Sequence, residues 1–322
     1  MATLHRVILF AASIISFSCL LMGCSREHGS ANTNPVPIEG AKFLKTDVKV
    51  EDFNPSGSDE TFIETSRIPR GKIPASSTPG YVVAGRSHFA VVTEKGRGRQ
   101  LTQNGVWVFN KQWKTVGLVV GLPFHAASES TNIEALWNKA GDMLAIVVDC
   151  SIKGTHNIDI GTINLKTRHF QHLLSLKMFD SASVVWAGNQ LFTSSSDNRN
   201  GASWTTILEI NPAKKQVREM YREKMDSDSD IWIQNLLPSP SGNFIAFDRR
   251  TPWQTEGAGV DVLNTKTGIT RQLTSEPRTN YYHYLGRWKD NYTLLFLRHN
   301  VPVSRCALYE VTLDSSWQSK AR

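Results

Sequence analysis

Short apolar segments alternate with clusters of turn-forming residues along most of this chain. The clearest example is the stretch 230–275, in which a turn cluster at residues 238–243 contains Pro and Gly and cannot continue a central strand. Four strands are expected there, at residues 231–237, 244–247, 260–263 and 269–274. A four-stranded antiparallel meander of about 45 residues has the size of one β-propeller blade.

Two sequence markers recur at a spacing of about 50 residues, which is the length expected of a repeating blade. The first marker is a residue at the end of an apolar strand and before a turn: Trp137, Trp186, Pro238 and Trp288. The second follows an apolar residue and opens the turn before the next strand: Asn110, Asn164, Asn211 and Asn264, with Thr312 in the last repeat. An Asn side-chain oxygen can accept a local backbone N–H, so it suits the start of a turn. The pattern predicts an all-β chain, a β-propeller of five or six four-stranded antiparallel blades.

The N-terminal part of the repeat region is harder to assign. Residues 41–80 hold two short extended patterns separated by several prolines, and proline at this density argues against a helical domain. The last repeat lacks a clear outermost strand. We therefore expect a strand within residues 46–67 to complete that repeat, or the same segment to supply most of a sixth blade. Residues 81–322 are assigned to the propeller itself.

The first residues predict an export signal. His5 and Arg6 precede an apolar run, residues 7–22, which suits the core of a signal peptide but is short for a membrane span. The run ends in Leu-Leu-Met-Gly-Cys, which resembles the lipobox of bacterial lipoproteins. This resemblance implies removal of residues 1–23, a lipid on Cys24 and, with Ser25 next, an outer-membrane location facing the periplasm. Residues 24–40 then form a flexible tether; an ordinary leader that contains a cysteine is the alternative.

Two segments of the clearest repeat also resemble a known family. The segments Pro-Ser-Pro-Ser-Gly-Asn-Phe-Ile-Ala-Phe (residues 238–247) and 260–274 are similar to the repeat of TolB-type β-propellers, although Ser241 stands where that repeat usually has Asp. The resemblance implies a propeller over about residues 81–317. By analogy it also implies that the partner is a protein or another component of the bacterial envelope. Together with the lipobox-like sequence and the lack of a clear catalytic motif, this predicts a non-catalytic, lipid-anchored scaffold.

Composition narrows the classes of partner. Lys and Arg number 36 against 29 Asp and Glu, a formal charge of +7, which can favour an anionic partner or a membrane surface but identifies neither. Nucleic acid is not expected as a partner, because no basic helix or aromatic RNA-binding motif accompanies the charge. Of the four cysteines, Cys19 and Cys24 fall in the leader and the lipid site, so only Cys150 and Cys306 could pair. They lie in different repeats, and we expect two partly buried thiols.

The motifs for catalysis or metal binding are weak, and no cofactor is expected. There is no Gly-x-Ser-x-Gly nucleophile motif in the sequence. A glycoside hydrolase needs two facing carboxylates, which sequence cannot locate, so a five-bladed carbohydrate-active enzyme is the alternative function. Asp226, Asp228 and Asp230 resemble the opening of a calcium loop, but Ile231 and Leu237 replace the glycine and glutamate that such a loop needs. We expect a solvated acidic loop there.

One face of the expected propeller carries the candidate binding residues. The connections between blades, and those between the second and third strand of each blade, should lie on one face. Trp, Tyr and Arg there can anchor an interface because they combine contact area with a polar group. The candidates are Trp204, Arg249, Arg250, Trp253, Tyr281, Tyr282, His283 and Arg298. The alternative is that some of these side chains fold back to cap the blades.

Overall fold

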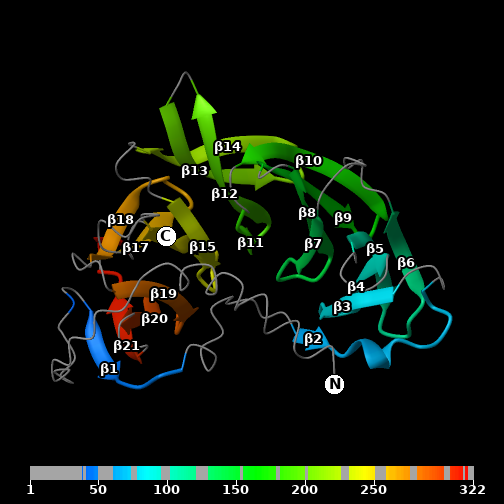
Figure 1. Cartoon of the computed structure of the whole chain (residues 1–322), viewed down its shortest axis with the longest axis horizontal. Coiled ribbons are helices and arrows are strands. Elements are labelled where there is room, and N and C mark those ends of the chain that lie inside the picture. Colours follow the sequence, from blue (N-terminus) through cyan, green and yellow to red (C-terminus); the bar gives the residue numbers. More distant parts are fainter. Residues whose placement is uncertain are drawn as a thin grey trace, which may run out of the picture. The chain divides into compact units, whose positions relative to one another are not determined.

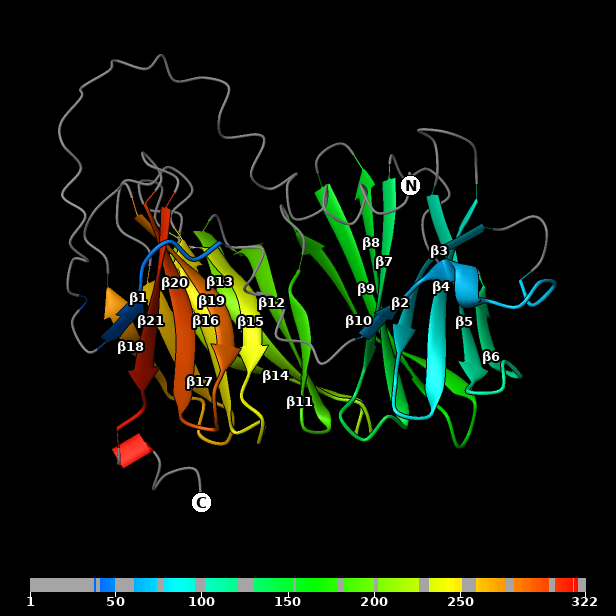
Figure 2. The same ribbon diagram turned by 90° about the horizontal axis from the view of Figure 1, so that it is seen from below.

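In the computed structural model, the described part of the chain is a five-bladed β-propeller (Figures 1 and 2). The structure describes residues 38, 41–49, 61–73, 78–95, 102–120, 130–152, 155–178, 182–199, 202–225, 232–250, 259–275, 281–300, 305–314 and 316–317. All of them belong to one compact unit, Val36–Arg322. Within these ranges no helix is long and apolar enough to cross a membrane.

Each blade is an antiparallel sheet, and all its strands except β1 follow one another in the sequence. Blade 1 consists of β2 (Thr61–Ile63), β3 (Thr78–Ala84), β4 (His88–Lys95), β5 (Thr102–Asn110) and β6 (Thr115–Val120). Blade 2 consists of β7 (Ser130–Trp137), β8 (Met143–Ile152), β9 (Thr155–Asn164) and β10 (His169–Met178). Blade 3 consists of β11 (Val184–Ala187), β12 (Gln190–Arg199), β13 (Ala202–Asn211) and β14 (Gln216–Met225). Blade 4 consists of β15 (Trp232–Pro238), β16 (Phe244–Arg250), β17 (Gly259–Asn264) and β18 (Thr270–Ser275). Blade 5 consists of β19 (Tyr281–Trp288), β20 (Thr293–Asn300), β21 (Arg305–Thr312) and β1 (Lys42–Lys45).

Apolar side chains from consecutive blades form shared cores. Alternation along each strand sends successive side chains to opposite faces, so that a blade can pack against a neighbour on each side. In blade 4, Ile245 and Phe247 pack toward blade 3, whereas Phe244 and Ala246 pack toward blade 5. Similar clusters join blades 1 and 2 and blades 2 and 3. This alternation decides which polar residues can meet between two blades.

The recurring tryptophans connect neighbouring blades. The indole N–H of Trp137 donates to the carbonyl of Val83 (3.2 Å) on β3, the first full-length strand of the preceding blade. Trp186 and Trp288 make the equivalent bonds, to the carbonyls of Leu136 (2.9 Å) and Leu237 (3.0 Å). Since a half-buried indole N–H needs an acceptor, the 50-residue marker reports the contact between blades.

The recurring asparagines stabilise the turns as predicted from the sequence. The side-chain oxygen of Asn110 accepts the backbone N–H groups of Gln112 and Lys114, at 3.0 and 2.9 Å. Asn164, Asn211 and Asn264 accept backbone N–H groups two or three residues later in the same way. Each asparagine therefore fixes the hairpin that leads into the last strand of its blade.

The N-terminal segment completes both ends of the propeller. β1 pairs with β21, so the strand that completes blade 5 is Lys42–Lys45 and does not fall within residues 46–67 as expected. β2 pairs with β3 as a fifth strand of blade 1, and the described strands form five sheets rather than six.

Apolar residues of the same segment cover one face of blade 5 and one face of blade 1. The apolar clusters on these two faces contain no residue from another blade. Val48 packs on the face of blade 5 that includes Leu297, and its N–H donates to the carbonyl of Cys306 (3.1 Å). On blade 1, Ile63, Ile68 and Ile73 pack against a cluster containing Val91 and Phe109. Ile38 is also buried, between blades 4 and 5, so packing begins within the segment predicted as a tether.

Candidate functional site

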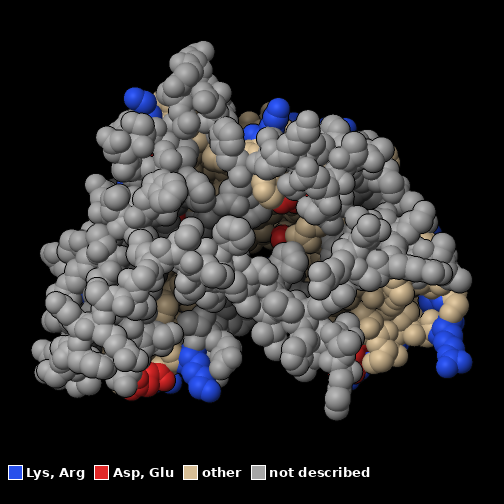
Figure 3. Space-filling view, viewed as in Figure 1, with Lys and Arg blue, Asp and Glu red and all other residues tan. Residues whose placement is uncertain are grey.

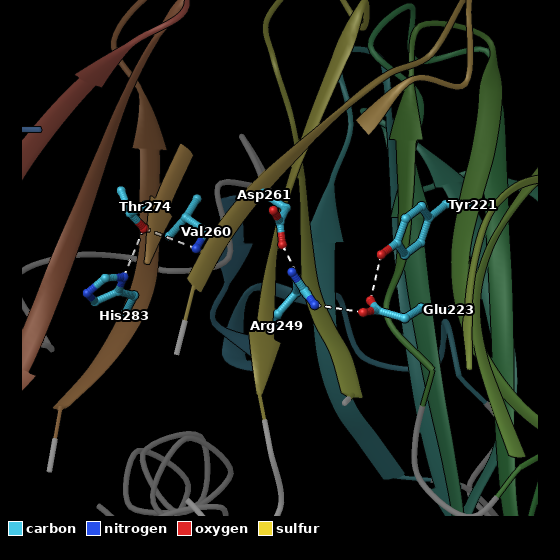
Figure 4. A network of polar contacts seen from close by, with 7 residues as sticks. All are labelled: Tyr221, Glu223, Arg249, Val260, Asp261, Thr274 and His283. Atoms are coloured by element: carbon cyan, nitrogen blue, oxygen red, sulfur yellow. Dashed lines mark hydrogen bonds and ion pairs between the residues drawn. The ribbon is translucent and has the colours of Figure 1, made fainter. Parts of the chain in front are cut away.

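Polar side chains gather at one end of blades 3, 4 and 5, beyond the apolar cores. This is the end at which the second strand of a blade finishes and the third begins. We call six residues there the polar layer: Tyr221, Glu223, Arg249, Asp261, Thr274 and His283 (Figure 4). The first four lie between blades 3 and 4, and the last two lie between blades 4 and 5. Of the candidate binding residues predicted from the sequence, all except Trp253, which lies outside the described residues, are on strands at this same end.

Arg249 on β16 holds two carboxylates from different blades. Its guanidinium donates to Glu223 Oε1 on β14 at 2.7 Å, and its Nε lies 3.4 Å from Asp261 Oδ2 on β17 (Figure 4). The Tyr221 hydroxyl donates to the other oxygen of Glu223 at 2.6 Å. The Asp261 side chain is only 5% exposed, against 26% for Arg249. Blade 3 is thus joined to blade 4 by a partly buried ion-pair network.

The contact between Arg249 and Asp261 leaves both groups incompletely satisfied. Among the described residues, neither Arg249 Nε nor Asp261 Oδ2 has a hydrogen-bond partner. Burial raises the pKa of Asp261 from 3.8 to about 7; Arg249 opposes this rise and Glu223 adds to it. Burial and the bond to Glu223 also raise the pKa of Tyr221. The network therefore contains a carboxyl group that binds a proton near neutral pH.

His283 lies in the interface between blades 4 and 5. Its side chain is fully buried, and its Nδ1 lies 3.0 Å from Thr274 Oγ1, which itself accepts the N–H of Val260 at 3.1 Å (Figure 4). Burial, and then the charge of Arg298, lower the pKa of His283 to about 3, so the imidazole is neutral. Thr274 Oγ1 and His283 Nδ1 share one hydrogen bond, and Nε2 has no hydrogen-bond partner among the described residues.

Blade 2 contributes acidic residues at the corresponding strand ends. Glu134 on β7 and Asp149 on β8 lie on the face that packs against blade 3, and His156 on β9 contacts Asp149 at 2.8 Å. Glu134 keeps exposed surface, but the surrounding protein limits its hydration; this and Asp149 raise its pKa to about 6. Acidic side chains are visible inside a hollow in the space-filling view (Figure 3). No group of three or more metal-ligating side chains was found among the described residues.

Of the eight predicted binding residues, two are buried, and the side chains of three others are not described. His283 and Arg298 are buried, at 0% and 5% exposure, because their positions on β19 and β20 face blade 4. They therefore do not present a surface to a partner, which differs from the expectation. Arg250, Tyr281 and Tyr282 lie at strand ends, and their side chains are not among the described ones.

Of the remaining three candidates, two are half-buried and one lies outside the described residues. Arg249 is half-buried and belongs to the ion-pair network. Trp204 on β13 is half-buried beneath the guanidinium of Arg222, whose central carbon lies 5.3 Å from the ring centroid. Trp253, the acidic residues Asp226, Asp228 and Asp230, and Cys24 lie outside the described residues. Their roles stay predictions.

Sequence reasoning missed Tyr221, Glu223 and Asp261. A signal for Asp261 was present, because it stands between Val260 and Val262 in β17, a strand in which every residue is buried. A carboxylate inside a buried strand needs a partner, so its position alone indicated an ion pair or a proton-binding group. Tyr221 and Glu223 gave no such signal, since β14 alternates charged residues like any solvated edge strand.

The two cysteines predicted to remain as thiols are both buried. Cys150 lies on β8 in blade 2 and Cys306 on β21 in blade 5, and no disulfide joins them. Burial raises the pKa of the Cys306 thiol to about 11. A thiol that ionises so weakly is a poor nucleophile at neutral pH.

No protein-family model matches the sequence, and no curated protein matches it. Among solved structures, the chain is similar to TolB from Acinetobacter baumannii at 13% identity over 69% of this chain and 51% of that one, with a TM-score of 0.36. An oligogalacturonate lyase in complex with manganese matches at 11% identity over 88% and 99%, with a TM-score of 0.43. Prolyl oligopeptidase B from Galerina marginata matches at 10% identity over 77% and 36%, with a TM-score of 0.48.

The chain spans about half the length of the TolB chain and about a third of the oligopeptidase. The three matched structures are a lyase, an oligopeptidase and TolB, all at 13% identity or less and with TM-scores below 0.5. They support no conclusion about what this chain binds or does.

Proposed function

We propose that the chain is a non-catalytic β-propeller that binds another protein at the bacterial cell envelope, where a lipid on Cys24 holds it to the membrane. The lipobox-like sequence supports the anchor, and the location follows from it. The candidate partner surface is the strand-end face that carries Trp204, Arg250 and Tyr281, and for which Trp253 is predicted from the sequence.

One observation supports a binding module over an enzyme. Glu223 and Asp261, the carboxylates of the polar layer, both contact the guanidinium of Arg249 between two blades. A hydrolase of the two-carboxylate type needs its acids to face a substrate across an open space. Here Glu223 joins blade 3 to blade 4 through Arg249, which stabilises the rim from which the connecting loops leave, and Asp261 lies against the same guanidinium within blade 4. Such a rim suits a rigid scaffold that presents loops.

The test is recovery of a cross-linked partner from membranes with Trp253→Ala/Tyr281→Ala. The matched control is Lys214→Ala/Lys266→Ala, two hairpin positions at the opposite end of the blades. We expect a partner that the unmodified chain and the control recover and that the double variant loses by at least about tenfold, as is typical of aromatic anchors. Equal recovery by all three proteins would remove this face from consideration.

The anchor has its own test. Cys24→Ala should abolish incorporation of labelled palmitate and move the protein from the membrane fraction to the soluble fraction. Retention of the label would show that Cys24 is not the lipid site.

A second candidate function rests on the perturbed carboxyl groups. Asp261 and Glu134 have pKa values near 7 and 6, and a general acid for glycoside cleavage must hold its proton near neutral pH. Purified protein would then cleave a glycan, and Glu134→Gln or Asp261→Asn would abolish that cleavage. Cleavage with this loss would establish an enzyme and overturn the binding-module proposal.

A further inference from the structure

The outer edge of blade 5 combines exposed apolar side chains with lysines. Among the described residues, only four large hydrophobic side chains are exposed, and two of them, Phe43 and Leu44, are consecutive in β1. Each is 37% exposed, and Lys42 and Lys45 on either side are exposed as well. β1 is the last strand of its sheet, beside β21 (Figure 1).

A β-bulge explains why two consecutive side chains are exposed. Phe43 stands opposite Tyr309 and Lys45 opposite Leu308, so Leu44 is an extra residue with no partner position on β21. A bulge interrupts the alternation of side chains and redirects one of them. Phe43 rests edge-on against the buried ring of Tyr309, with centroids 5.7 Å apart, which holds this short strand in place.

The charge around this step is positive. Lys42, Lys45 and the exposed Lys49 lie within eight residues, with Asp47 as the acid among them. Glu310, opposite Lys42, already pairs with Lys289 at 3.1 Å. A lysine near an anionic lipid surface is attracted to it, and exposed aromatic and aliphatic side chains can enter the boundary between headgroups and acyl chains.

We propose that β1, with Lys42, Phe43, Leu44 and Lys45, docks on an anionic phospholipid surface, the lysines meeting the headgroups and the two apolar side chains entering between them. This inference deepens the proposed lipid anchoring and rests on it for the location. Residues 25–37 would separate the lipid from the buried Ile38 and span at most about 45 Å. β1 follows directly, so it is the first strand that the anchor brings to the membrane.

A second copy of the chain is a less suitable occupant of this edge. Antiparallel pairing of two β1 strands would place Lys42 of each copy opposite Lys45 of the other, and like charges directly opposite destabilise a sheet. A four-residue bulged edge with lysine at both ends is a common defence against strand addition. An anionic lipid surface, by contrast, carries the charge opposite to that of these lysines.

The experiment uses the unit Val36–Arg322, which contains every described strand and all six apolar clusters and so carries its own core. It lacks Cys24, so the result does not depend on lipidation. Co-sedimentation is measured with vesicles of phosphatidylglycerol mixed with phosphatidylcholine, and with phosphatidylcholine alone. We expect binding to the mixed vesicles that weakens with salt, and little binding to the neutral ones.

Two variants separate the contributions. Lys42→Gln/Lys45→Gln, at exposed positions, should lower the affinity about 25-fold, since each lysine near an anionic surface contributes about fivefold. Phe43→Ser/Leu44→Ser should lower it by at least about tenfold. The matched control is Val217→Ser/Ile269→Ser, the other two exposed hydrophobic residues, and it should bind as the unmodified unit does.

Equal binding by all four proteins, or no binding by any, would overturn the inference. A dimer in solution that the β1 variants abolish would assign the edge to a second copy and overturn it too. Loss of the envelope partner in Trp253→Ala/Tyr281→Ala concerns the other proposal, so the docking of β1 and the proposed function can fail independently.

Discussion

Replacement of Asp261 by asparagine should stabilise the protein at alkaline pH and have little effect at acid pH. The folded state raises the pKa of this carboxyl from 3.8 to about 7. The group therefore favours folding fully below its unfolded pKa, and this contribution is lost as the pH rises through about 7. Above that, the folded protein contains a buried carboxylate whose contact with Arg249 does not offset its lost hydration.

The magnitude follows from the size of the shift. A change of about three pKa units corresponds to about 4 kcal/mol, which is the upper limit of the difference between the two ends of the titration. Between about pH 9 and pH 5 most of it, about 3 kcal/mol, should appear. The asparagine side chain resembles the protonated carboxyl in shape and charge, so Asp261→Asn removes the alkaline cost while Arg249 keeps Glu223.

Urea unfolding of both proteins at about pH 9, 7 and 5 measures the effect. We expect the variant to be more stable at the highest pH and the difference to vanish as the pH falls. Glu209→Gln, which removes a carboxylate from a surface pair with Arg218, is the matched control and should change stability by less than about 1 kcal/mol. If Asp261→Asn were less stable at the highest pH, the ion pair would outweigh burial and the reasoning would be wrong.

Three further changes test other parts of the fold. Burial lowers the pKa of His283 to about 3, so its contribution to stability is present above about pH 6.5 and decreases as the pH falls. His283→Gln should remove this loss, which is about 2 kcal/mol at about pH 5. Urea unfolding of both proteins at that pH measures it. Trp186→Phe keeps a ring but loses the bond to the carbonyl of Leu136, and should lower the free energy of unfolding by about 1–2 kcal/mol; no change would show that the bond is dispensable. Gly242 has a φ of +74°, and a methyl group there would lie 2.7 Å from the backbone N of Gly188, so Gly242→Ala should lower the free energy of unfolding by at least about 2 kcal/mol. Gly188 has a φ of +64° and open space around it, so Gly188→Ala should lower it by less. Equal losses in the two variants would refute the clash.

The repeat was predictable because it depends on local chemistry. Asparagine at a turn and an indole at the end of a strand are needed wherever a blade of this kind begins or turns, so they recur with the blade length. The position of the closing strand was not predictable in the same way. β1 is four exposed residues whose pairing with β21 depends on a partner far away in the sequence.

The polar layer was predictable only in part. Arg249 could be placed at the strand-end face from the order of strands, but its partners come from two blades, and Glu223 lies on a strand with no distinctive pattern. His283 and Arg298 were placed at the correct end of their strands but their burial was missed, because the face of a strand depends on where its alternation starts next to a loop.

The pairing of β1 with β21 also affects how the chain folds. The first and the last of the described strands are neighbours, so blade 5 lacks two of its four strands until β21 can pair with both β20 and β1. Until then Phe43 and Leu44 have no sheet to join, and the lysines beside them keep this waiting segment soluble. Deleting either the first or the last described strand therefore damages the same blade, blade 5. Two segments far apart in the sequence depend on each other for the integrity of that one sheet.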